Sequence, residues 1–223
     1  MTHNLMSIEK RESELAVYLD KQPYMTQLDG IHLEIAKNVF PSDFGLTSCF
    51  FGDFILQQQA APTALDMGCG SGYFALLLKK IGCTDVLGVD FNIDAVKCAA
   101  ANSQRNPDLH PTDFLHSDLF VNVPVTTFDL IVFNFNYYPS NGDFGLNSDG
   151  GREILKRFFS EVDSYIHDNT IIYIPYSEFV GVEHDPRHIC PAFGFSVDIV
   201  AATANHNGEH YVYKIMKDKT AAL

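Results

Sequence analysis

Hydrophobic positions change their period along the chain, and each change marks the boundary of a predicted element. The apolar run at 63–67 includes one acid and is typical of a short buried strand. Three glycines follow, and then apolar residues recur at i, i+3, i+4 and i+7 in Phe74, Leu77, Leu78 and Ile81, which is the spacing of one helix face. The pattern predicts a strand, a tight turn and a helix, the start of a βαβ unit.

The same periodicities extend this unit in both directions. Before it, we expect a helix at 5–20, a strand at 31–36 in a small hairpin, and a helix at 47–59. After it, strands are predicted at 85–90, 114–120, 128–133 and 170–176, and helices at 92–104 and 149–166. The segments 196–201 and 211–216 alternate around a turn at 205–208 and predict a closing antiparallel hairpin.

These elements divide the chain after residue 60. Residues 61–223 form the predicted ligand-binding core, and residues 1–60 form an N-terminal extension that is too short for a separate large domain. Two roles remain open for the extension, which could cap the ligand site or cover a sheet edge.

The amino-acid composition limits the size of the fold and the kinds of molecule that the chain is expected to bind. The 223 residues are 46% hydrophobic, enough for one α/β domain with an extension. The net charge is −13 and no basic cluster appears, so we expect no nucleic-acid partner. No apolar run is long enough for a membrane span or resembles a signal peptide, which predicts a cytoplasmic chain with no membrane partner. Five cysteines without a C-x-x-C pair fit a reducing compartment.

The glycine turn and two acids form the first candidate site. Asp66 precedes Gly68, Gly70 and Gly72, and Asp90 follows 24 positions after Asp66, at the end of the next predicted strand. Glycines let the backbone approach a ligand closely, and the helix N-terminus that follows favours a negative group. An acid at the position of Asp90 can hold both hydroxyls of a ribose. The alternatives are an ordinary tight turn for the glycines and a helix N-cap for Asp90.

The string A-L-D-M-G-C-G-S-G at 64–72 resembles the first motif of class I methyltransferases that depend on S-adenosylmethionine (SAM). In that family the turn faces the methionine part of SAM. The string S-D-L-F at 117–120 is similar to the family's third-strand motif, which implies that Asp118, with Leu119 beside it, binds the adenine amine. A plain turn residue is the alternative for Asp118. The resemblance implies a Rossmann-like fold with a seven-stranded, mostly parallel sheet whose last strand is antiparallel, and SAM as cofactor or substrate.

A second motif lies at the end of the fourth predicted strand. The string F-D-L-I-V-F-N-F-N-Y-Y-P at 128–139 resembles the F-D-L-I-V-x-N-P-P-Y motif of amide and amine methyltransferases, such as the glutamine methyltransferases of release factors. The resemblance implies that Asn134 lies at SAM and accepts a hydrogen bond from the substrate nitrogen, and that Tyr137 packs on a planar acceptor. Phe135 and Asn136 replace both prolines, so the turn lacks their stiffening. A strand-end cap is the alternative for Asn134.

Two further features complete the list of candidates. Tyr176 ends the fifth predicted strand, where it could face the substrate or the sulfonium of SAM, and a place in the core or at the rim is the equal alternative. His184 and His188 have the i, i+4 spacing of metal ligands, but Pro186 interrupts a regular helix between them. We therefore expect no metal site.

Together these features predict a SAM-dependent transferase that methylates a nitrogen of a small amine or amide in biosynthesis, with Asn134, Tyr137 and Tyr176 as catalytic candidates. The acidic composition and the absence of a recruiting helical domain favour a small-molecule acceptor over a polymer. One alternative is a SAM-cyclising enzyme similar to azetidine-2-carboxylate synthases, which releases methylthioadenosine. The other is a non-catalytic SAM-binding partner protein. The acceptor and the oligomeric state stay open.

Overall fold

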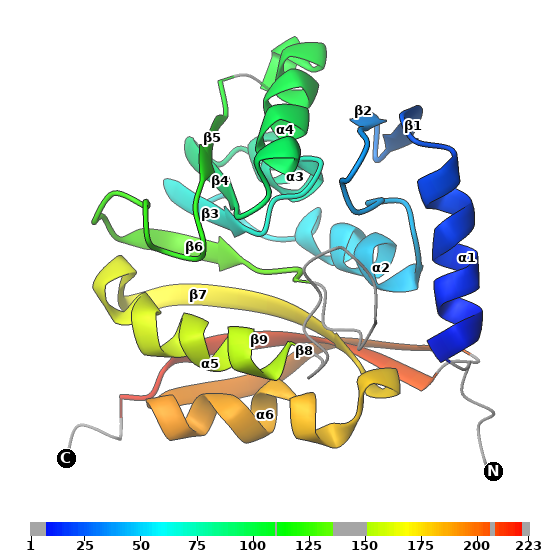
Figure 1. Ribbon diagram of the computed structural model, residues 1–223. Helices are drawn as coiled ribbons and strands as arrows, with labels where there is room; N and C mark the ends of the chain where they lie inside the picture. Colours follow the sequence, from blue (N-terminus) through cyan, green and yellow to red (C-terminus); the bar gives the residue numbers. More distant parts are fainter. Residues whose placement is uncertain (1–7, 110, 136–150, 206–207, 220–223) are drawn as a thin grey trace.

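The computed structural model describes residues 8–109, 111–135, 151–205 and 208–219. Within these ranges the chain forms a seven-stranded sheet with helices on both faces (Figure 1). In spatial order the strands are β5 (Asp113–His116), β4 (Asp85–Asp90), β3 (Thr63–Met67), β6 (Phe128–Val132), β7 (Ile166–Ser177), β9 (Gly208–Lys217) and β8 (Phe195–Asn205). β9 runs antiparallel to β7 and β8, and the other neighbours are parallel. The predicted Rossmann-like fold and closing hairpin are confirmed.

The central strands are buried on both faces because successive side chains of a strand point to opposite sides of the sheet. In β6, Leu130 and Val132 belong to one hydrophobic core, whereas Ile131 belongs to the other. Residues of α2 and α3 complete the first core, and residues of α5 and α6 complete the second. The helices that flank the sheet are α2 (Leu46–Ile55), α3 (Tyr73–Lys80), α4 (Ile93–Arg105), α5 (Arg152–Glu161) and α6 (Pro186–Ile189).

The boundaries of several strands differ from the sequence prediction, and those of β5 and β7 have a clear physical cause. β5 ends at His116 and not at 120, because the Ser117 hydroxyl donates to the Leu119 carbonyl at 2.7 Å and Leu119 turns the backbone with φ +47°. β7 begins at Ile166 and not at 170. Its ladder with β6 starts opposite Phe128 and then shifts register, so the strand includes a polar stretch that interrupts the apolar pattern.

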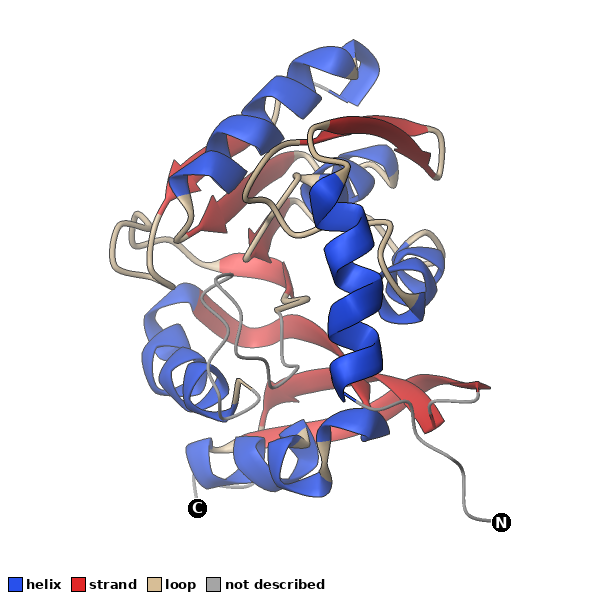
Figure 2. Cartoon of the chain, turned by 45° about the vertical axis from the view of Figure 1, so that its right-hand side comes forward, coloured by secondary structure: helices blue, strands red, loops and turns tan. Residues whose placement is uncertain are grey.

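The N-terminal segment forms its own small unit against the core. Its elements are α1 (Ile8–Asp20), β1 (Tyr24–Leu28) and β2 (Ile31–Ile35), and the two strands pair as a separate antiparallel sheet, as predicted. The side chains of Asn102 on α4 and of Asn106, the C-cap of that helix, bond to the backbone of β2 at Glu34 and His32. α1 stands beside the sheet, outside both helix layers (Figure 2). No helix in the described ranges is long and apolar enough to cross a membrane.

Candidate active site

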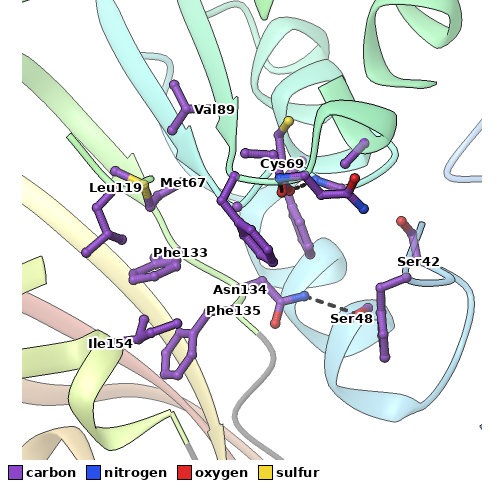
Figure 3. Close-up of a pocket in the computed structure, with 18 of the residues that line it drawn as sticks. Ser42, Ser48, Met67, Cys69, Val89, Leu119, Phe133, Asn134, Phe135 and Ile154 are labelled. Carbon is purple, nitrogen blue, oxygen red and sulfur yellow. Dashed lines mark hydrogen bonds between the residues drawn. The ribbon is translucent and has the colours of Figure 1, made fainter. Parts of the chain in front are cut away.

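Loops at the carboxyl ends of four parallel strands meet around a cavity of about 180 Å³. They follow β3, β4, β5 and β6 and contribute residues 67–70, 89–92, 117–119 and 133–135. β3 lies between β4 and β6, where the strand order reverses, and open parallel sheets bind their ligands at such a point. The N-terminal segment closes the other side with residues from α1, from the loop after β2 and from the start of α2. Figure 3 shows Ser42 and Ser48 of this segment opposite Leu119.

The glycine turn is held by its own backbone amides. Gly68 and Cys69 both donate to the Val89 carbonyl, at 2.8 and 2.9 Å, and Gly70 donates to a carboxylate oxygen of Asp90 at 2.9 Å. These bonds tie the turn after β3 to the end of β4. The three amides therefore position the turn and are not the donors that would bind a negative ligand group.

Gly70 and Gly72 serve different purposes within this turn. A Cβ built on Gly70 would meet no atom within 4 Å, so this residue opens directly onto the cavity. A Cβ on Gly72 would lie 2.9 Å from the Ala99 side chain, so this glycine permits the start of α3 to pack on α4. Both have positive φ, +54° and +83°, a region that costs other residues energy.

Asp66 lies behind the turn and is not among the residues that line the cavity. One of its carboxylate oxygens accepts from the Ala75 backbone N–H at 2.8 Å, which caps the start of α3. The other oxygen is buried and has no hydrogen-bond partner among the described residues. Burial raises the pKa of Asp66 to about 7, and the nearby charge of Asp90 adds to this shift. From this position Asp66 supports the turn, and its contact with the methionine end of the ligand stays a prediction.

Asp90 lines the cavity at the end of β4, where the sequence places it. One oxygen accepts from Gly70 and the other from the backbone N–H of Asn92 at 2.8 Å. A carboxylate has about four acceptor positions, so Asp90 can still accept from a hydroxyl of a ligand. Burial raises the pKa of Asp90, although the backbone donors oppose this shift. The N-cap of α4 is Asn92 and not Asp90, since the Asn92 side chain accepts from the Asp94 N–H.

Asp118 and Leu119 reach the cavity from the loop after β5. The Asp118 side chain is exposed and pairs with Arg157 of α5 at 3.1 Å. Leu119 is buried with a positive φ, and the Ser117 hydroxyl fixes its carbonyl. A non-glycine residue in this conformation is held by its surroundings and often lies at a functional site. The two residues are therefore available at one end of the cavity, as the adenine expectation requires.

Asn134 enters the cavity from the end of β6, and its orientation is defined (Figure 3). Its side-chain nitrogen donates to the Ser48 hydroxyl of α2 at 3.2 Å. The flanking residues Phe133 and Phe135 are buried, with ring centroids 4.7 Å apart. Because the amide nitrogen is directed at Ser48, the carbonyl oxygen of Asn134 points away from Ser48, where it can accept a hydrogen bond from a ligand.

The structure does not place the other two predicted catalytic residues, Tyr137 and Tyr176, at the cavity. Tyr137 lies outside the described residues. Tyr176 is buried in the core beside Tyr213, and its hydroxyl donates to the Gly181 carbonyl at 2.7 Å. It does not line the cavity, so the structure offers no support for the predicted contact with a substrate.

The sequence left open whether the N-terminal segment caps the site, and it named none of the residues that line the cavity from this segment. Arg11, Ser42, Thr47 and Ser48 all line the cavity, and Ser42 also bonds to Ser71 of the glycine turn at 2.5 Å between the two hydroxyl oxygens. Thr47 and Ser48 lie at the start of a predicted helix, which is a common place for hydroxyl residues. This position alone does not indicate which residue they contact.

Comparison with known proteins agrees with this architecture. Residues 48–184 match the family model described as methyltransferase small domain. A putative protein N5-glutamine methyltransferase of Methanocaldococcus jannaschii is 36% identical over 146 residues, which cover 61% of this chain and 72% of that protein. A ribosomal protein L11 methyltransferase of Cupriavidus pinatubonensis is 40% identical over 76 residues, but these span only 34% of this chain and 24% of that protein. The crystal structure of a ribosomal protein L11 methylase from Lactobacillus delbrueckii subsp. bulgaricus superposes with a TM-score of 0.58 at 19% identity and covers 76% of each chain.

Proposed function

Because the chain belongs to the methyltransferase small domain family of class I SAM-dependent enzymes, we propose that it methylates an amide nitrogen, with a protein glutamine side chain as the acceptor. The observation that carries this proposal is the oriented side chain of Asn134 in the cavity. The 36% identical relative, which is named as a putative protein N5-glutamine methyltransferase, supports the acceptor class.

The described residues fit SAM as the methyl donor. Gly70 leaves open space next to the turn, and the buried carboxylate of Asp90 faces the same cavity. We assign Asp90 to the ribose hydroxyls, and Asp118 with Leu119 to the adenine. SAM supplies a methyl group that is already activated by its positively charged sulfur. The residues of this chain therefore bind, align and exclude water, and alignment alone can contribute about 7–11 kcal/mol.

Asn134 supplies the acceptor contact in this proposal. A primary amide has two N–H groups and a nitrogen lone pair that is delocalised into its carbonyl. When one N–H donates to the Asn134 carbonyl oxygen, the nitrogen is fixed in place and gains electron density. A bond then forms between the nitrogen and the methyl carbon while the carbon–sulfur bond breaks. Sulfur keeps that electron pair, and the nitrogen releases one proton to water.

The sequence favoured a small-molecule acceptor, and the comparisons do not support that preference, because the first relatives are named for protein substrates. The test uses the purified chain with methyl-labelled SAM and an extract of its source cells, separated into proteins and small molecules. We expect label on glutamine residues of a protein, found by mass spectrometry after digestion, and no label with Asn134→Ala. Label only in the small-molecule fraction would overturn the protein acceptor.

Incubation with SAM alone tests the two remaining alternatives. Methylthioadenosine and a four-membered-ring amino acid would establish SAM cyclisation and overturn methyl transfer. Tight SAM binding with no product in any fraction, together with a stoichiometric protein partner, would establish a binding role. Under the proposal, SAM stays intact until an acceptor is added.

A further inference from the structure

The cavity is electrostatically uneven. The acids Asp90 and Asp118 line it from the loops after β4 and β5, and Arg11 lines it from α1. Among the described residues that line the cavity, Arg11 is the one lysine or arginine, and none of the residues outside the described ranges is a lysine or arginine. A ligand with one negative group therefore has a single cationic side chain to approach.

Arg11 is held at the start of α2. Its guanidinium carbon lies 4.9 Å from the ring centroid of Phe44, and one guanidinium nitrogen lies 3.7 Å from the point where a Cβ on Gly45 would be. Gly45 is the N-cap of α2 and provides no side-chain cap for its first amides. The positive end of the helix and the guanidinium therefore act on the same part of the cavity.

The backbone amides of the glycine turn that face β4 are not available to bind a negative group of the ligand. Gly68, Cys69 and Gly70 donate to Val89 and Asp90 instead. SAM carries one carboxylate, at the end of its methionine part, and its adenosine lies at the opposite end. Leu119 and Ser42 lie on opposite sides of the cavity in Figure 3, which places the assigned adenine residues away from the N-terminal segment.

We propose that Arg11 binds the α-carboxylate of SAM, so that the N-terminal segment forms part of the cofactor site and caps it. Arg11 lies before residue 48, where the match to the family model begins. This inference depends on the binding of SAM and not on the identity of the acceptor. The assignment of Arg11 and the proposal of a protein acceptor can therefore be disproved separately.

The test compares binding of SAM with binding of decarboxylated SAM, which lacks only the carboxylate, by calorimetry in the absence of any acceptor. Arg11→Gln should weaken SAM binding by roughly ten- to a hundred-fold, the range of a charge-assisted hydrogen bond. It should leave the affinity for decarboxylated SAM unchanged, and Arg11→Lys should retain part of the difference. The retained binding of decarboxylated SAM also shows that the variant is folded.

Lys10→Gln is the matched control, because it removes the same charge from the adjacent position of α1, where the side chain is exposed and does not line the cavity. Its SAM affinity should equal that of the wild type. Equal weakening of both ligands by Arg11→Gln, or weakening of neither, would overturn the assignment. An unchanged SAM affinity with a raised KM for the acceptor would also overturn it and assign Arg11 to the acceptor.

Discussion

The side-chain amide of Asn134 donates to the hydroxyl of Ser48 across 3.2 Å, which joins the loop after β6 to the start of α2. An amide has donors on one side and an acceptor on the other, so a fixed nitrogen also fixes the carbonyl oxygen. We predict that Ser48→Ala lets the amide rotate and lowers kcat by roughly two- to ten-fold, the value of one neutral hydrogen bond. Steady-state kinetics and calorimetry should show an unchanged Kd for SAM.

Ser48→Thr is the control for this prediction, since it keeps the hydroxyl at the same place. It should retain most of the kcat that Ser48→Ala loses. If both variants lose kcat and SAM affinity together, Ser48 acts through packing of α2 and not through Asn134.

Asp90 should contribute to affinity through its charge. Asp90→Asn removes that charge while keeping the shape of the side chain, so S-adenosylhomocysteine should bind roughly ten- to a hundred-fold more weakly. Asp94→Asn is the matched control, because Asp94 follows Asp90 closely, in the first turn of α4, and does not line the cavity. Equal affinities of Asp90→Asn and the wild type would remove Asp90 from the ligand site.

Substitutions of Gly70 and Gly72 should separate ligand binding from folding stability. Gly72→Ala places a methyl group 2.9 Å from Ala99 at a positive φ, and should lower the free energy of unfolding by about 2–4 kcal/mol. Gly70→Ala meets no protein atom and should cost only about 1 kcal/mol of backbone strain. Its methyl group enters the cavity, so it should weaken S-adenosylhomocysteine binding more than its stability cost implies. Urea unfolding and calorimetry on both variants measure the two effects, and the reverse pattern would contradict these roles.

Asp66 should make stability depend on pH. Its pKa is about 7 in the folded chain, against an ordinary value of 3.8, because of burial. Between these two values the carboxyl group keeps its proton in the folded chain but loses it in the unfolded chain. Ionisation therefore favours the unfolded chain, and stability is higher at low pH. This advantage is lost as pH rises from about 4 to about 7, at up to about 1.4 kcal/mol per pH unit.

Asp66→Asn tests this dependence, because asparagine still accepts from Ala75 but does not ionise in this range. Unfolding free energies measured from pH 4 to 8 should fall less steeply for the variant than for the wild type. Parallel curves would show that Asp66 does not cause the slope.

Local sequence pattern determined most of the fold and the part of the site built by the parallel strands. Alternating periods predicted β3, α3 and β4, and the carboxyl ends of parallel strands lie at one edge. Asp90 and Asn134 could therefore be placed at this edge from their strand positions, whereas Asp118 was assigned from the resemblance of its motif. The same period of two also puts Tyr176 on the buried face of Ile172 and Ile174, although its position at a strand end suggested a site residue.

Only the tertiary structure decided how the N-terminal segment meets this edge. Ser48 is separated from Asn134 by 86 positions, and Ser42 from Ser71 by 29. No local periodicity relates such residues, because their contact depends on the path of α1, of the loop after β2 and of α2 across the core. A strand and its turn are encoded by neighbouring residues, whereas a site closed by two distant segments depends on how the elements pack together.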